Sequence, residues 1–168
     1  MAKISRETMS QIILMFSCAA LVAAWVAQYV FGFEACILCL YQRYLYIAAI
    51  FLLAFSLYFM HGHFQSFFLV VTALVLLACA GTAAYQVAIE NQWVPLPKIC
   101  GTPLPTGSFE DFKNIISSRS YIACDKVEWS LFGISMAGYN FVLALVLSIL
   151  SFIGVFCNGR AAKKFTRR

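Results

Sequence analysis

Four of the seven cysteines of this chain fall into two groups that could carry thiol chemistry. Cys36 and Cys39 are separated by two residues, whereas Cys100 and Cys124 occur much later in the chain. A Cys-x-x-Cys sequence that opens a helix places both sulfurs close together, and a thiolate at a helix N-terminus is stabilised by the macrodipole and by free amide donors. We therefore expect thiol–disulfide chemistry at these cysteines.

Arg43 is the candidate partner of the first pair. It follows Cys39 by four residues and Cys36 by seven, so a helix places all three side chains on one face, with both cysteines within about 40° of Arg43. A guanidinium inside an apolar zone costs roughly 2.5–3.5 kcal/mol at mid-bilayer, and such residues are functional candidates by default. We expect Arg43 to stabilise the Cys39 thiolate and to bind an oxygen that becomes anionic on reduction, such as a quinone carbonyl. A lipid headgroup anchor is the alternative.

The second pair lies in a polar segment, 90–132, that also contains all four prolines. A bond between Cys100 and Cys124 would stabilise the fold by about 3.5 kcal/mol in the chain-closure model, which would suit a structural staple. However, the prolines predict an extended, exposed segment around Cys100, and the positive charge of Lys98 would help a thiolate to form there. These two features favour a working disulfide.

Membrane-spanning helices must position these residues. The chain is 62% hydrophobic and 11% charged, with a mean hydropathy of +0.84, which exceeds what a soluble core needs. A span needs about 20 apolar residues, and the apolar blocks accommodate four. We predict an all-α membrane protein, a four-transmembrane-helix bundle forming one domain over residues 1–168. The expected spans are 10–31, 40–60, 64–89 and 137–157.

The basic residues predict the orientation in the membrane. The net charge of +5 is concentrated before the first span and after the last, so the positive-inside rule places both termini in the cytoplasm. Both cysteine pairs then lie in the periplasm of a bacterium, where disulfides persist. We expect a multi-pass protein of the bacterial inner membrane, with the first span retained because its apolar stretch is too long for a signal peptide. We interpret the basic residues at both ends as a signal of membrane topology, and we expect no nucleic-acid binding.

Two surface features complete the expected architecture. After Gly107, apolar residues recur at helical spacing behind Ser108, a candidate N-cap, which predicts a short amphipathic helix on the outer membrane surface. A loop helix that packs on its own protein would have the same pattern. Trp93 and Trp129 bracket this loop, as interfacial anchors do, and Gly62 predicts a tight turn between the second and third spans.

We expect no metal site. Zinc bound by the four cysteines is the alternative, but the second pair lacks the tight spacing of a zinc ribbon. The two histidines beside Gly62 fit a solvated turn better than a metal site. The three cysteines within spans behave as small apolar side chains, and no role is assigned to them: Cys18, Cys79 and Cys157.

Two motifs together closely resemble the DsbB family of disulfide bond formation proteins. The first is Cys-Ile-Leu-Cys-Leu-Tyr-Gln-Arg, ending at Arg43, and the second is Cys-Asp-Lys-Val-Glu-Trp-Ser-Leu-Phe-Gly-Ile-Ser-Met, ending at Met136. The resemblance covers nearly the whole chain. It implies a thiol oxidoreductase that reoxidises a DsbA-like periplasmic oxidase of the thioredoxin fold and passes the electrons to ubiquinone or menaquinone.

The resemblance also implies roles for the cysteines. The redox-active disulfides would be Cys36–Cys39 and Cys100–Cys124. The reduced partner would attack Cys100, Cys124 would turn to Cys36, and Cys39 would be released as a thiolate. That thiolate would reduce the quinone and regenerate the bond to Cys36.

Arg43 and Met136 are the residues that the resemblance places near the quinone. One departure is Gln42, where some relatives have an acidic residue. A second enzyme class, resembling vitamin K epoxide reductases, also combines a helical bundle with Cys-x-x-Cys, but there the motif comes late in the chain. A tetraspanin-like organiser is the non-enzymatic alternative, although its Cys-Cys-Gly signature is missing here.

Overall fold

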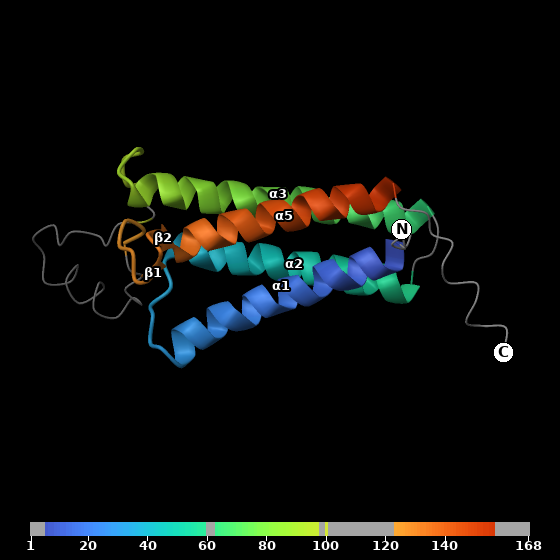
Figure 1. Cartoon of the computed structure of the whole chain (residues 1–168), viewed down its shortest axis with the longest axis horizontal. Helices are drawn as coiled ribbons and strands as arrows, with labels where there is room; N and C mark the ends of the chain where they lie inside the picture. Colours follow the sequence, from blue (N-terminus) through green and yellow to red (C-terminus); the bar gives the residue numbers. More distant parts are fainter. Residues whose placement is uncertain (1–5, 60–62, 98–99, 101–122, 157–168) are drawn as a thin grey trace, which may run out of the picture.

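The computed structural model of this chain describes residues 6–59, 63–97, 100 and 123–156. Over these residues, four long helices form a bundle (Figure 1), each long and apolar enough to cross a membrane. The predicted fold class, an all-α membrane protein with a four-helix bundle, is confirmed. The helices are α1 (Arg6–Tyr29), α2 (Ile37–Phe59), α3 (His63–Glu90) and α5 (Met136–Phe156).

The helix boundaries differ from the predicted ones by a few residues, for identifiable reasons. Helix α2 begins before the predicted residue 40 because Cys36 caps it: the Cys36 sulfur accepts the backbone N–H of Cys39 at 3.3 Å, as an N-cap side chain does. Helix α1 ends before the predicted residue 31, and the chain then turns at Gly32, whose φ of 73° suits glycine.

A short β-hairpin that the sequence did not predict precedes α5. Its strands, β1 (Ser130–Leu131) and β2 (Ile134–Ser135), pair antiparallel. The two residues between them, Phe132 and Gly133, have φ of 51° and 78°, the backbone of a two-residue hairpin turn. We call this end of the bundle, where α1 and α3 end and α2 and α5 begin, the hairpin end. Figure 1 shows it opposite the end where α1 begins.

The helices pack through small polar and apolar side chains. In Figure 1, α3 and α5 run side by side, and the Ser148 and Ser151 hydroxyls of α5 donate to the Ala73 and Leu69 carbonyls of α3 at 2.8 and 2.9 Å. Such small residues let helix backbones approach closely in a membrane. Helix α1 crosses the bundle obliquely and diverges from the other helices at the hairpin end. A cavity at this end is lined by residues of α1 and of the other three helices.

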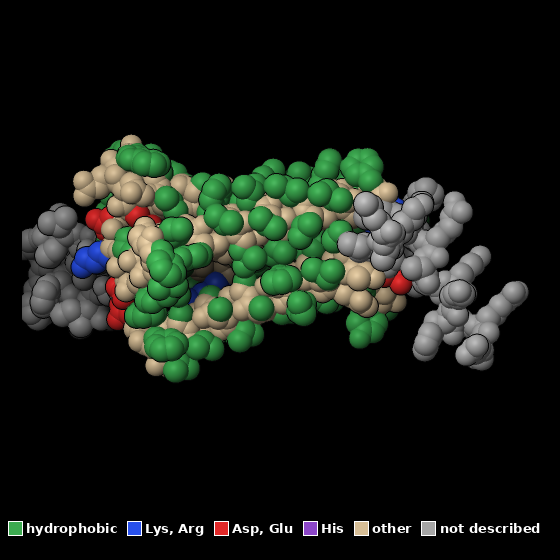
Figure 2. All heavy atoms as spheres, viewed as in Figure 1, with side chains coloured by type: hydrophobic (Ala, Val, Ile, Leu, Met, Phe, Trp, Pro, Cys, Tyr) green, Lys and Arg blue, Asp and Glu red, His purple; other side chains and the backbone are tan. Residues whose placement is uncertain are grey.

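The outer face of the bundle is apolar along its length. Figure 2 shows hydrophobic side chains over the middle of the bundle and charged ones gathered at the hairpin end. Large side chains such as Phe51 and Tyr58 are 71% and 82% exposed. A continuous apolar surface of this size indicates contact with lipid rather than water.

Ile13 provides a test of the packing because its side chain is fully buried. We expect Ile13→Ala to lower the free energy of unfolding by about 2 kcal/mol, mostly through the cavity left behind, because lipid and protein interiors are similarly apolar. Met15 on the same helix is 60% exposed, so Met15→Ala should change it by less than about 0.5 kcal/mol. Unfolding in mixed detergent measures both, and equal losses would contradict the observed burial.

Several sequence predictions lie outside the described residues. These are the amphipathic helix after Gly107, the turn at Gly62, the charge of Lys98, and Cys157.

Candidate redox site and cavity

The four cysteines with predicted roles lie together at the hairpin end. Cys36, Cys100 and Cys124 belong to one buried cluster, and Cys39 packs against it. A disulfide joins Cys100 to Cys124, with a Cα–Cα distance of 5.3 Å. The sulfurs of Cys36 and Cys39 are 2.8 Å apart and are not bonded as a disulfide. The fold thus brings a disulfide and a dithiol side by side.

The predicted exposure of Cys100 is wrong. Its side chain is only 3% exposed, and that of Cys124 is 1% exposed. The Cys100 backbone N–H donates to the Pro97 carbonyl at 2.9 Å. The disulfide packs with Leu38 and Ile89 of the bundle, where burial of these apolar groups stabilises it.

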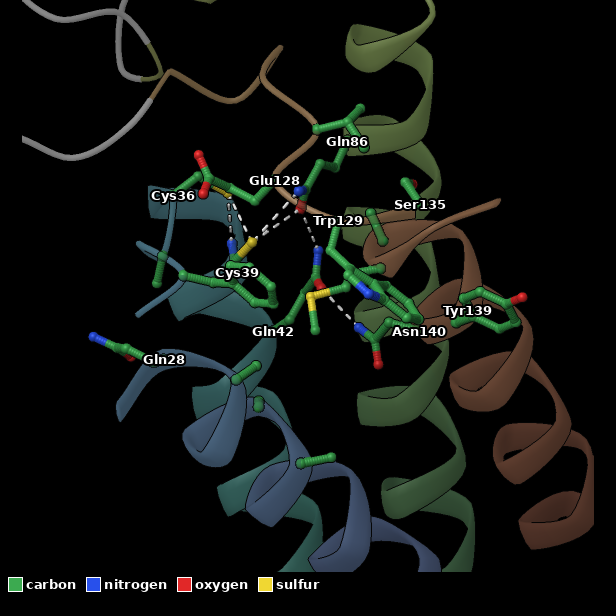
Figure 3. Close-up of a pocket in the computed structure, with 18 of the residues that line it drawn as sticks. Gln28, Cys36, Cys39, Gln42, Gln86, Glu128, Trp129, Ser135, Tyr139 and Asn140 are labelled. Carbon is green, nitrogen blue, oxygen red and sulfur yellow. Dashed lines mark hydrogen bonds between the residues drawn. The ribbon is translucent and has the colours of Figure 1, made fainter. Parts of the chain in front are cut away.

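The surroundings of Cys36 favour its protonated thiol form. Its hydrogen bond with Cys39, together with burial of the side chain, raises the pKa of the Cys36 thiol. A negative charge on the pair is therefore better placed on the sulfur of Cys39, and Cys39 faces the adjacent cavity (Figure 3).

A cavity of about 410 Å³ lies beside the dithiol, within the usual range for small-molecule sites. Cys36, Cys39, Arg43 and Met136 all line it. Figure 2 shows a hollow on one face of the bundle with a basic side chain inside it. The wall contributed by α1 consists mostly of small side chains: Ala20, Ala23, Ala24 and Ala27.

Two hydrogen bonds to residues of α1 hold the Arg43 side chain at the cavity. Its Nη1 donates to the Gln28 side-chain oxygen, and its Nη2 donates to the Ala24 carbonyl at 3.1 Å. Arginine carries five N–H donors, so these two bonds leave donors for a ligand in the cavity. The helix spacing predicted the shared face of Arg43 and Cys39, but it gave no indication of Gln28.

A chain of side-chain amides, which the sequence did not predict, ends at Cys39. Gln86 of α3 lies 3.4 Å from the Cys39 sulfur through its Nε2 atom, and its amide continues to Gln42 and then to Asn140 (Figure 3). The signal was present in the sequence, because amide side chains within apolar spans are costly and mark sites or helix contacts.

The hairpin and the start of α5 close the cavity on another side. Met136, the first residue of α5, is 40% exposed and lines the cavity. Trp129, predicted as an interfacial anchor, also lines it, and its ring lies 6.2 Å from that of Tyr139. Trp93 projects freely, with 77% of its surface exposed. Trp129 therefore belongs to the site, whereas Trp93 alone has the exposure of a free anchor.

Comparisons with known proteins agree with this arrangement. Residues 6–154 match the family model described as "Disulfide bond formation protein DsbB". The chain is also 26% identical over 152 residues to "Uncharacterized protein RP370" of Rickettsia prowazekii (strain Madrid E), a match that covers 89% of this chain and 86% of that protein. No solved structure matches the chain. Because the family match covers most of its length, the chain belongs to the DsbB family and is a multi-pass membrane disulfide oxidoreductase.

Proposed function

We propose that this protein reoxidises a DsbA-like periplasmic dithiol oxidase of the thioredoxin fold and passes the electrons to a membrane quinone, ubiquinone or menaquinone. One observation carries the proposal: a disulfide and a dithiol share one cluster, and the dithiol borders a cavity that also holds a guanidinium. Membership of the DsbB family supports the same reaction.

The proposed exchange begins at the Cys100–Cys124 disulfide. A partner thiolate attacks Cys100, the sulfur–sulfur bond breaks, and Cys124 leaves as a thiolate. Cys124 then attacks Cys36 of an oxidised Cys36–Cys39 pair, which releases the thiolate of Cys39. The second partner thiol resolves the mixed disulfide and releases the Cys100 thiolate. Cys100 then attacks Cys124, the Cys124–Cys36 bond breaks, and Cys36 leaves as a thiolate that takes up a proton. The partner has then been oxidised, and the Cys36–Cys39 pair has been reduced by two electrons.

The Cys36–Cys39 pair is reoxidised at the cavity. A quinone held there would supply a two-electron, two-proton acceptor for this pair. Cys39 faces the cavity, and Arg43, one turn further along α2, supplies donors for an oxygen that becomes anionic. The alanine wall of α1 and the apolar side chain of Met136 would admit a flat apolar ring and exclude water.

The proposed location is the bacterial inner membrane, with cytoplasmic termini and periplasmic cysteines. The basic residues near both ends of the sequence support this orientation. The cysteine cluster lies at the hairpin end, opposite the end where α1 begins. A disulfide at that end would meet the oxidising periplasm.

The function is tested with purified protein, a reduced thioredoxin-fold dithiol and a soluble ubiquinone analogue. We expect loss of quinone absorbance only when protein and dithiol are both present. Cys100→Ser should lower the rate of quinone reduction by about 10³-fold or more, because the partner then has no disulfide to attack.

Cys18→Ser is the matched control, because Cys18 lies within α1 and outside the cysteine cluster. It should retain the wild-type rate. A wild-type protein that reduces no quinone under these conditions would refute the proposed function.

A further inference from the structure

The hydrogen bonds that lead to Cys39 form one directed chain. The Tyr46 hydroxyl donates to the Asn140 Oδ1 at 2.8 Å, and the Asn140 Nδ2 donates to the Gln42 Oε1 at 2.6 Å. The Gln42 Nε2 then donates to the Gln86 Oε1 at 3.0 Å. Finally, the Gln86 Nε2 donates to the Cys39 sulfur at 3.4 Å. Each amide receives a hydrogen bond at its oxygen and passes one on from its nitrogen, so the dipoles of the chain align toward Cys39.

Glu90 determines the direction in which hydrogen bonds are donated along this chain of side chains. The Gln86 Nε2 also lies 3.3 Å from a carboxylate oxygen of Glu90, one turn further along α3. A carboxylate only accepts hydrogen bonds, so the nitrogen of Gln86 must face Glu90 and Cys39. The oxygen of Gln86 must then face Gln42. If the chain ran in the reverse direction, the Gln86 oxygen would face the Glu90 carboxylate, and two acceptors would lie against each other.

The amide of Gln86 has a partner for each protonation state of Cys39. Its Nε2 lies 3.4 Å from the Cys39 sulfur and can donate to a thiolate. Its Oε1 lies 3.6 Å from the same sulfur and can accept from a thiol. In the part of the chain that the structure describes, the other hydrogen-bond partner of this sulfur is the Cys36 thiol, 2.8 Å away, so the Gln86 amide adds a second donor when Cys39 is a thiolate.

We infer that Gln86 stabilises the Cys39 thiolate by direct hydrogen bonding, and that Gln42, Asn140 and Tyr46 are positioning residues that orient its amide for this purpose. The stabilised thiolate is the form of Cys39 that carries electrons toward the cavity. That use of the thiolate rests on the proposed function, whereas its stabilisation by Gln86 does not.

The competing explanation is purely structural. The chain joins α2, α3 and α5, and amides commonly hold membrane helices together. Gln86 is 6% exposed and Gln42 is also 6% exposed, so both are buried enough for that role. If the chain is only structural, its loss should alter access to Cys39 and change the rate of Cys39 alkylation by the same factor at every pH. If Gln86 stabilises the thiolate, the decrease in the alkylation rate should depend on pH.

The test measures alkylation of Cys39 by iodoacetamide in the full chain carrying Cys36→Ser, with the modified site identified by mass spectrometry. In this background, Gln86→Glu keeps the size of the side chain and the acceptor but replaces the donor with an oxygen. We expect alkylation at pH 7 to slow about 10- to 100-fold, because a hydrogen bond to a charged group is lost. The rates should converge at strongly alkaline pH, where the thiolate forms in every variant.

Two further variants keep the result interpretable. Gln86→Met removes both polar atoms at similar length and should show the same convergence, even if Gln86→Glu folds poorly. Tyr46→Phe removes only the first donor of the chain and should slow alkylation by about two- to threefold. The control makes the same two changes at Gln65, the other buried glutamine among the described residues of α3, and should leave the rate unchanged.

Two outcomes would overturn the inference: an unchanged rate in both Gln86 variants, or a rate lowered by one constant factor at every pH. Because the assay contains neither quinone nor partner protein, its result is independent of the proposed function. Failure of quinone reduction alone would leave the stabilisation by Gln86 standing.

Discussion

Cys39→Ser should lower the rate of quinone reduction by about 10³-fold or more. A hydroxyl cannot form the disulfide that completes the oxidation of Cys36, although the two sulfurs lie only 2.8 Å apart in the native protein. The loss should therefore be nearly complete, whatever the concentration of quinone. The rate of absorbance change of a soluble ubiquinone analogue, with a reduced thioredoxin-fold protein as donor, measures it.

The same variant contains its own control. Cys39→Ser retains the Cys100–Cys124 disulfide, so it should still oxidise about one equivalent of the partner dithiol in a single turnover. A folded variant that exchanges with the partner but reduces no quinone would separate the two halves of the reaction. Sustained quinone reduction by Cys39→Ser would exclude Cys39 as the sulfur that faces the electron acceptor.

Arg43→Met should lower kcat/KM for the quinone analogue by about 10²-fold. Methionine preserves the unbranched apolar stem but removes the donors and the charge that Arg43 presents to the cavity. The oxidation of one equivalent of partner dithiol should remain, because Arg43 takes no part in the exchange proposed for the Cys100–Cys124 disulfide. Steady-state rates at varied quinone concentration distinguish this loss from a general loss of folded protein.

Two variants refine the assignment of Arg43. Arg43→Lys keeps the charge without the planar set of donors, so we expect an intermediate loss. Gln28→Leu removes the side chain that receives a hydrogen bond from Arg43, and we expect a loss of about threefold to tenfold because the guanidinium is then less well oriented. If Arg43→Met retains kcat/KM within about twofold, Arg43 is an anchor for lipid headgroups instead.

Local features of the sequence determined the four helices and the position of the first cysteine pair. Runs of apolar residues reveal spans because the bilayer sets their length, and the match with α3 was within one residue at each end. The proximity of Cys36 and Cys39 follows from their spacing alone, as does the shared face of Cys39 and Arg43. The hairpin at Phe132 and Gly133 was missed because Phe132 does not signal a left-handed turn, which more often uses asparagine or glycine.

Only the tertiary structure decided what surrounds those residues. Proline spacing predicted an exposed Cys100, but packing on Leu38 and Ile89 buries it, and that contact joins segments far apart in the chain. The partner of Cys39 is Gln86, 47 positions away. A buried amide must find a hydrogen-bond partner, but its own sequence does not specify which one. That choice depends on how the helices rotate and cross, and this is set by side-chain packing across the whole bundle.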